Sequence, residues 1–305
     1  MYKANEFDAL VVRALALPGR AHMRPVIEKE LLHYDILFAL EQAGLLDSLT
    51  FQGGTLLRLC HGAPRFSEDL DFVGGRQFAS SDMAAIKSCV EQYVGARYAL
   101  EVSVREPHEL REEPEYADIR VDKWQVSVIT SPDRPDLPRQ RIKIEIANVS
   151  AYTREPRALV QNYDFLPDGY GDVLVLAETL SEVMADKLVS LINCERYVRY
   201  RDIWDLRWLV QQGATVDAAL LNHKLVDYQV SNYTQKVQQM IERLSDIIYG
   251  KEFFDTLSRF IPMEVQERTL RQQKFLNFLV VETRELLVKA QHAVTDSAAE
   301  LKFRM

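Results

Sequence analysis

The stretch FQGGTLLRLCHGAPRFSEDLDFVGG, residues 51–75, places a Gly-Gly-Thr sequence ahead of an Asp-Leu-Asp sequence, with two arginines between them. The alternation in Asp-Leu-Asp-Phe predicts a strand over 69–73, in which both carboxylates face one side while Leu and Phe pack on the other. A short strand over 49–51 leads into the glycines, and a helix is expected to start at Thr55. The stretch therefore predicts a strand–helix–strand unit with a polar site.

The residue types in this unit indicate a metal–triphosphate site. The parallel carboxylates of Asp69 and Asp71 would repel each other, and a divalent cation relieves that repulsion. Mg²⁺ prefers one or two carboxylates together with phosphate oxygens. The turn of Gly53, Gly54 and Thr55 lets the backbone approach phosphates, and the helix N-terminus behind it attracts anions. Asp-Leu-Asp taken alone would also fit an edge strand with a solvated acidic face.

Periodicity divides the rest of the chain into two parts. Helices are expected over 25–47 and 80–94, and strands over 99–104, 119–130, 141–149 and 173–177. After these come almost only helical patterns, over 180–195, 201–212, 215–228, 231–248 and 264–290. The fold class is therefore α+β: an α/β domain over 1–165 with a mixed sheet, followed by a mainly helical domain over 166–305.

Composition narrows the class of protein. The chain has 305 residues and a formal net charge of −8, which disfavours a protein that holds nucleic acid mainly by neutralising phosphates. Its three cysteines show no zinc-ligand spacing, and no apolar run approaches the roughly 20 residues of a membrane span. We expect a cytoplasmic protein with no membrane partner.

The glycine–carboxylate arrangement resembles the DNA-polymerase-β-like nucleotidyltransferases, which need a third acid on a neighbouring strand. Glu145 in RIKIEIA is the candidate, because it alternates with Ile144 and Ile146 and so faces away from the apolar side. The resemblance implies that Asp69, Asp71 and Glu145 hold Mg²⁺. A surface acid paired with a neighbouring basic residue is the alternative for Glu145 alone.

More narrowly, the chain resembles the AbiEii/AbiGii-type nucleotidyltransferase toxin family, which is related to the mycobacterial MenT toxins. The first motif of that family matches Gly53, Gly54, Thr55, Arg58, Arg65, Ser67, Asp69 and Asp71. The segment ADKLVSLINCERYVRYRDIWDL resembles its other two motifs, through Lys187 and through Arg201, Asp202 and Asp205. Ser190 and Cys194 depart from the family pattern, and Arg196 is a candidate substitute for the missing arginine.

The resemblance implies a toxin of a bacterial toxin–antitoxin or phage-defence system, with a cognate antitoxin. It would move a nucleotide from an NTP to an acceptor, with tRNA the preferred one. Lys187 and Asp205 would be catalytic, whereas Arg201 and Asp202 would join the nucleotide site. Arg58 and Arg65 would either contact phosphates or pin the hairpin. Transfer to a protein or small molecule, and a non-catalytic nucleotide- or partner-binding module, are the alternatives.

Overall fold

The computed structural model describes residues 4–110, 119–133 and 136–303, and it divides into two compact units, Met1–Ala177 and Glu178–Met305. The division falls later than the boundary at 165 drawn from the sequence. The reason is that strand β7 (Leu174–Ala177) pairs with β1 (Thr50–Gln52) and so belongs to the sheet of the first unit.

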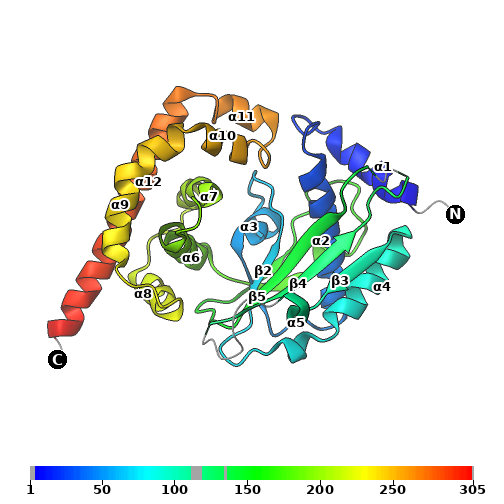
Figure 1. The fold of residues 1–305 in the computed structure, drawn as a ribbon, viewed down its shortest axis with the longest axis horizontal. Helices are drawn as coiled ribbons and strands as arrows, with labels where there is room; N and C mark the ends of the chain where they lie inside the picture. The colour runs from blue at the N-terminus through cyan, green and yellow to red at the C-terminus, as the bar shows by residue number, and fades with distance from the viewer. Residues whose placement is uncertain (1–3, 111–118, 134–135, 304–305) are drawn as a thin grey trace. The chain divides into compact units, whose positions relative to one another are not determined.

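Within the described residues the first unit has one mixed sheet of seven strands in the order β3-β4-β5-β2-β1-β7-β6 (Figure 1). The remaining strands are β2 (Leu70–Val73), β3 (Val102–Arg105), β4 (Val121–Val128), β5 (Gln140–Ala147) and β6 (Glu155–Ala158). The pairs β2–β5 and β1–β7 are parallel, and the other neighbouring strands are antiparallel.

The apolar side of the sheet forms the core of the first unit. Trp124 of β4, Ile144 of β5 and Phe72 of β2 are buried, as the alternation predicts, whereas the intervening side chains are more exposed. The helices of this unit are α1 (Ala4–Leu15), α2 (Arg24–Gln42), α3 (Gly53–His61), α4 (Ile86–Tyr98) and α5 (Pro107–Leu110). Of these, α2 and α4 run side by side, and α2 packs on the sheet (Figure 1).

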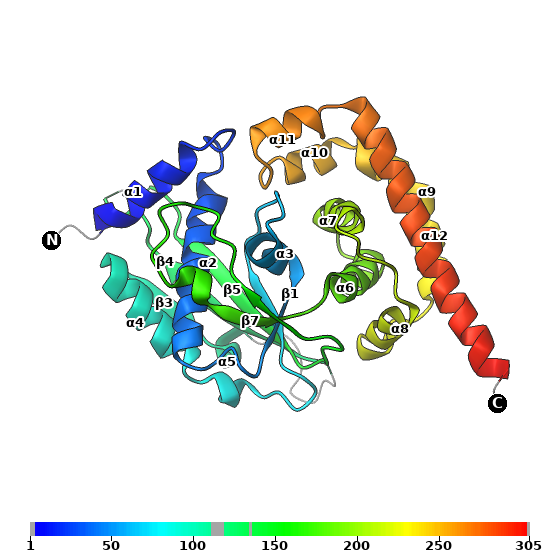
Figure 2. The same ribbon diagram turned by 180° about the vertical axis from the view of Figure 1, so that it is seen from behind.

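The second unit is helical throughout its described residues. It consists of α6 (Leu180–Asn193), α7 (Tyr200–Gln211), α8 (Ala218–Asp227), α9 (Tyr233–Tyr249), α10 (Lys251–Leu257), α11 (Met263–Arg268) and α12 (Gln273–Phe303). The long helices α9 and α12 pack along each other, and α12 also contacts α7 and α8 (Figure 2). Among the described helices, none combines the length and the apolar composition needed to cross a bilayer.

Several elements differ from the sequence prediction. The helix expected over 80–94 is a short 3-10 helix at Ser80–Met83 followed by α4, and the helix expected over 264–290 is broken into α11 and α12. The second break lies at Thr269, whose backbone leaves the helical region (φ −132°, ψ −86°). The sequence patterns above do not predict α1, nor the short elements β6 and α10.

Helix α2 carries several buried charged side chains, and Asp35 is fully buried among them. The Asp35 carboxylate accepts hydrogen bonds from the hydroxyls of Tyr170 and Tyr98, and Arg97 Nε lies 3.1 Å from it. Burial raises the pKa of Asp35 to about 6 despite these partners, which by themselves would lower it. The folded protein therefore binds a proton at this carboxyl more tightly than the unfolded chain does.

This raised pKa predicts a pH-dependent contribution to stability. The folded protein binds the Asp35 proton more tightly than the unfolded chain does, so the contribution is complete below pH 3.8 and is lost as pH rises through about 6. The quantity to compare is the difference in free energy of unfolding between the native protein and Asp35→Asn. This difference should fall by on the order of 3 kcal/mol as pH rises from 3.8 through about 6, and it should stay level at higher pH. Urea unfolding between pH 4 and pH 8 measures the difference, with the exposed Asp47→Asn as control. A difference that is flat with pH would contradict it.

Candidate active site

The two acidic strands of the predicted site lie next to each other. Strands β2 and β5 pair in parallel with Asp71 directly opposite Glu145, so their side chains leave the same face of the sheet. Asp69 precedes β2, and its Oδ1 accepts a hydrogen bond from the backbone N–H of Lys143 at 3.0 Å. Lys143 Nζ also lies 3.8 Å from Glu145 Oε1. The structure thus places Asp71 and Glu145 side by side, with Asp69 just before β2. Among the described residues, the acids whose ligand atoms all lie within 4.8 Å of one another are a different set, Glu178, Glu182 and Asp186.

The Asp71 carboxylate lies against the first residue of helix α3. A Cβ built on Gly53 would stand 2.5 Å from Asp71 Oδ2, and Gly53 has a left-handed φ of +78°. The N-cap residue Gln52 makes no side-chain cap, so no N-cap side chain covers the first N–H groups of α3. Exposed N–H groups at a helix N-terminus bind anions such as phosphate. The Asp71 carboxylate is therefore in direct contact with the glycine turn at the N-terminus of α3.

The next residues of the motif fix the position of this helix. Thr55 is buried, and its hydroxyl donates to the carbonyl of Asp69, which ties the first turn of α3 to the start of β2. A Cβ on Gly54 would stand 2.5 Å from an Arg65 guanidinium nitrogen and 3.0 Å from Ser67 Oγ. Arg65 Nη1 donates to the carbonyl of Phe66 at 2.7 Å. These buried side chains pack behind the glycine turn.

Arg58 points into the interior of the first unit. Its guanidinium donates two hydrogen bonds to Glu30, at 2.7 and 3.0 Å, and a third to the carbonyl of Ala63 at 2.9 Å. It also stacks over Phe66, 4.2 Å from the ring centroid. Of the two roles predicted for this arginine, these contacts favour holding the hairpin in place over contacting a phosphate.

In the second unit, helices α6 and α7 bring Lys187 to the two aspartates of the Arg-Asp-x-x-Asp-Leu sequence. Lys187 Nζ lies 3.0 Å from Asp202 Oδ1 and 2.8 Å from Asp205 Oδ2, and all three residues are buried. Burial alone would raise the pKa of Asp202, but Lys187 and Arg199 together lower it well below its usual range. Asp202 therefore stays ionised and holds the lysine in place.

Two further residues complete this network, and the sequence analysis did not assign either to the site. Ser190, at the position where the family often has alanine, donates to Asp202 at 2.9 Å. Arg199 also donates to Asp202, whereas the expected substitute Arg196 is exposed. Arg201 stacks over Phe260, 4.9 Å from its ring centroid. The only sequence signal for Arg199 is its place in a segment rich in arginine and aromatic residues.

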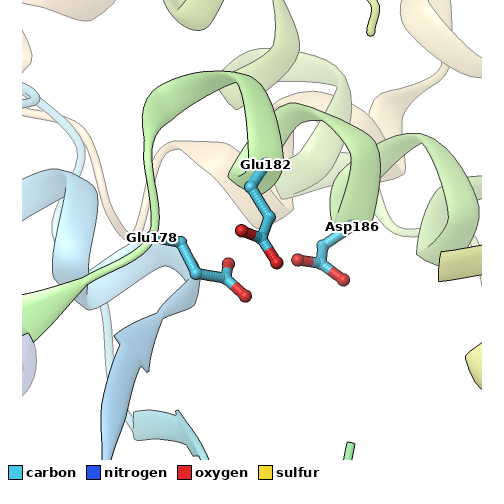
Figure 3. Close-up of side chains that lie close together, drawn as sticks. All are labelled: Glu178, Glu182 and Asp186. Atoms are coloured by element: carbon cyan, nitrogen blue, oxygen red, sulfur yellow. The ribbon is translucent and has the colours of Figure 1, made fainter. Parts of the chain in front are cut away.

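A second acidic cluster lies at the start of α6, where Glu178, Glu182 and Asp186 point toward one another (Figure 3). Lys224 Nζ stands between them, 2.9, 2.8 and 2.9 Å from the three carboxylates, at the position that a metal ion would need. Burial opposes the charge of Lys224, but the carboxylates outweigh it and raise its pKa. A lysine ammonium therefore fills this cluster.

The two clusters thus differ in how well they suit Mg²⁺. Asp69, Asp71 and Glu145 are partly exposed, and Asp71 adjoins the glycine turn at the start of α3, as a metal–nucleotide site requires. In the other cluster burial raises the pKa of Glu178, with the charge of Asp186 adding to it, and Lys224 already supplies the positive charge. The donor set and the glycine cradle of the first cluster fit a metal bound together with a triphosphate.

Removing Lys224 should destabilise the second unit strongly. In Lys224→Met the buried Glu178 and Glu182 and the half-buried Asp186 lose their cation, so we expect the free energy of unfolding at pH 7 to fall by about 3–5 kcal/mol. Chemical denaturation measures the loss. Lys236→Met is the control, since Lys236 pairs with the exposed Glu195 and its loss should cost less than about 1 kcal/mol. Equal effects of the two changes would contradict the role assigned to Lys224.

A comparison with protein families supports the same class of protein as the sequence motifs and the site described above. The family model described as "Nucleotidyl transferase AbiEii toxin, Type IV TA system" matches residues 35–279. Among proteins of curated function, none matches the sequence.

A solved structure shows the same fold. MenT4, a nucleotidyltransferase toxin from Mycobacterium tuberculosis, superposes with a TM-score of 0.56 at 20% identity, over 94% of this chain and 92% of its own. JHP933 from Helicobacter pylori matches over 91% of this chain and 96% of its own at 17% identity, with a TM-score of 0.42 that is too low to carry an argument. The likeness to MenT4 supports the α+β fold, and the family match covers both units. The chain therefore belongs to the AbiEii family of nucleotidyltransferase toxins.

Proposed function

We propose that this nucleotidyltransferase is Mg²⁺-dependent and moves a nucleoside monophosphate from an NTP to an acceptor RNA, with tRNA the favoured acceptor. The observation that carries the proposal is the contact between the Asp71 carboxylate and Gly53 at the N-terminus of α3, with Glu145 in register beside Asp71. A carboxylate set and a phosphate-binding turn that touch each other suit a metal–triphosphate group.

Residues of the first unit would hold the nucleotide. Asp69, Asp71 and Glu145 would provide oxygen ligands for Mg²⁺, which when bound supplies positive charge to the phosphates of the NTP. The N–H groups at Gly53 and Gly54 would bind phosphate oxygens. Thr55, Arg65 and Ser67 are buried behind this turn, so we assign them to its positioning rather than to the ligand.

In the reaction itself, the acceptor hydroxyl oxygen would form a bond to the α-phosphorus while the bond to the pyrophosphate oxygen breaks. The hydroxyl proton would pass to a carboxylate, Glu145 or Asp205. The ammonium of Lys187 would stabilise the charge that develops on the phosphate oxygens. Because Asp202 and Asp205 already hold Lys187 in one position, the lysine is oriented before substrate binds.

Features of the sequence bear on the identity of the acceptor in two opposite ways. The family match supports a toxin with an antitoxin, and an arginine- and aromatic-rich segment over 196–208 suits RNA. The net charge of −8 favours a protein or a small molecule as the acceptor instead. We place the protein in toxin–antitoxin or phage-defence biology in the cytoplasm.

A labelling experiment tests the reaction and the acceptor together. The protein is incubated with labelled NTPs, Mg²⁺ and total tRNA, and then with cell extract, and the RNA, protein and small-molecule fractions are counted separately. We expect label in the RNA fraction, none after chelation of the metal, and none with Asp69→Asn combined with Asp71→Asn. Label confined to another fraction would overturn the acceptor. The double variant is also expressed in cells beside the native protein. If it transferred as much label as the native protein, or arrested growth as strongly, the catalytic role of the two aspartates would be overturned.

The glycine cradle gives a sharper variant. Gly53→Ala places a Cβ where Asp71 Oδ2 now stands, so we expect transfer to fall by on the order of 100-fold as the carboxylate is displaced. Gly62→Ala is a matched control at the other end of α3, because Gly62 also has a positive φ (+68°) but a Cβ there meets nothing within 4 Å. Initial rates of transfer measure both. Similar rates for the two variants would show that contact with Asp71 does not matter.

A further inference from the structure

The second unit has a cavity of about 250 Å³ beside the Lys187 network. Its lining includes Tyr197, Arg199, Arg201, Asp202 and Thr256. Sites for drug-sized ligands run to roughly 300–1,000 Å³, so this cavity is too small for a whole NTP and suits a single base with part of its backbone.

The side chains of the cavity combine an aromatic ring with positive charge. Tyr197 is 62% exposed, which is a large exposed fraction for an aromatic side chain. Arg201 lies over Phe260 and is thereby held at the cavity. Aromatic stacking platforms beside basic side chains are how proteins bind single-stranded nucleic acid.

Asp202 links the cavity to the proposed catalytic residues. Its carboxylate lines the cavity and also accepts from Arg199 and from Lys187, the latter at 3.0 Å. The negative charge of Asp202 is thus matched by Lys187 and Arg199, and Arg201 brings a further guanidinium to the lining of the cavity. A ligand in the cavity would be separated from Lys187 by one carboxylate.

An adjoining cavity offers a comparison within the same unit. It shares Tyr200 with the first and is lined by two basic and two acidic residues, Arg243, Lys251, Asp246 and Glu252. Tyr200 donates its hydroxyl to Glu252 at 2.7 Å. This balance of charge gives no preference for a phosphate, so the observations single out the cavity at Tyr197.

We propose that the Tyr197 cavity binds one nucleotide of a single-stranded RNA acceptor, with the base stacked on Tyr197 and its phosphate near Arg201. The inference rests on the proposed function in one respect, that the acceptor is RNA. Since the NTP is assigned to the glycine turn of the first unit, this cavity serves the other substrate. Stacking makes binding tolerant of base identity, and the arginine makes it dependent on salt.

The test measures RNA binding apart from the reaction. A fluorescein-labelled single-stranded RNA of about 12 nucleotides is titrated with protein in EDTA and without NTP, and anisotropy gives the dissociation constant. We expect Tyr197→Ala to weaken binding about tenfold and Tyr197→Phe to bind within about twofold of the native protein. Arg201→Gln should weaken RNA binding. It should also reduce the slope of the logarithm of the binding constant against the logarithm of the salt concentration by about one.

Matched controls lie elsewhere on the same unit. Tyr249→Ala and Arg284→Gln remove an exposed tyrosine on α9 and an exposed arginine on α12, outside both cavities, and should leave binding unchanged. If Tyr197→Ala binds RNA as Tyr249→Ala does, the inference is wrong, even where label transfer persists. If Tyr197-dependent binding is found but no label reaches RNA, the cavity stands and the proposed reaction fails. Thermal unfolding of each variant confirms that it is folded.

Discussion

The parallel pairing of β2 with β5 is the constraint on which the proposed active site depends. It sets Asp71 opposite Glu145, two residues that are 74 positions apart in the chain, and so builds a carboxylate pair on one face of the sheet. A slip of one residue would turn one acid of the pair to the apolar face, among Leu70, Ile144 and Ile146. The register is therefore held by the same apolar alternation that forms the core. Gly53 begins the turn to which we assign the phosphates, and only a residue without a side chain fits there against the Asp71 carboxylate.

Two buried lysines in the second unit form similar ion pairs but have different surroundings. Lys224 lies among three carboxylates and is inaccessible to solvent, so its ammonium acts as a permanent counterion that stabilises the fold. Lys187 is also paired with carboxylates, but Asp202 of that network lines an open cavity. This difference is the reason for proposing a catalytic role for Lys187 and not for Lys224. In the same way, the lysine that fills the cluster of Glu178, Glu182 and Asp186 supports the proposal of a metal in the first unit.

Local patterns predicted the parts of the structure that depend on neighbouring residues. The alternation in β5 predicted that Glu145 faces away from Ile144 and Ile146, which are buried. The helix predicted from residue 180 begins there as α6, where the Thr179 hydroxyl accepts from the Glu182 N–H. Features set by distant partners could not be predicted in this way. Arg58 faces inward because Glu30, 28 residues earlier, receives it. Strand β6, with the sequence Glu-Pro-Arg-Ala, has no alternation and exists through its pairing with β7. Arg199, rather than Arg196, reaches Asp202 because of where α7 begins.

Locating the metal tests the central claim most directly. A crystal of the protein with Mn²⁺ and a non-hydrolysable NTP, measured at the manganese absorption edge, reports the metal position independently of activity. We predict an anomalous peak at Asp69, Asp71 and Glu145, with the triphosphate at the N-terminus of α3 and none at Glu178, Glu182 and Asp186. A peak at the cluster that Lys224 fills, or a nucleotide bound away from Gly53, would contradict the account.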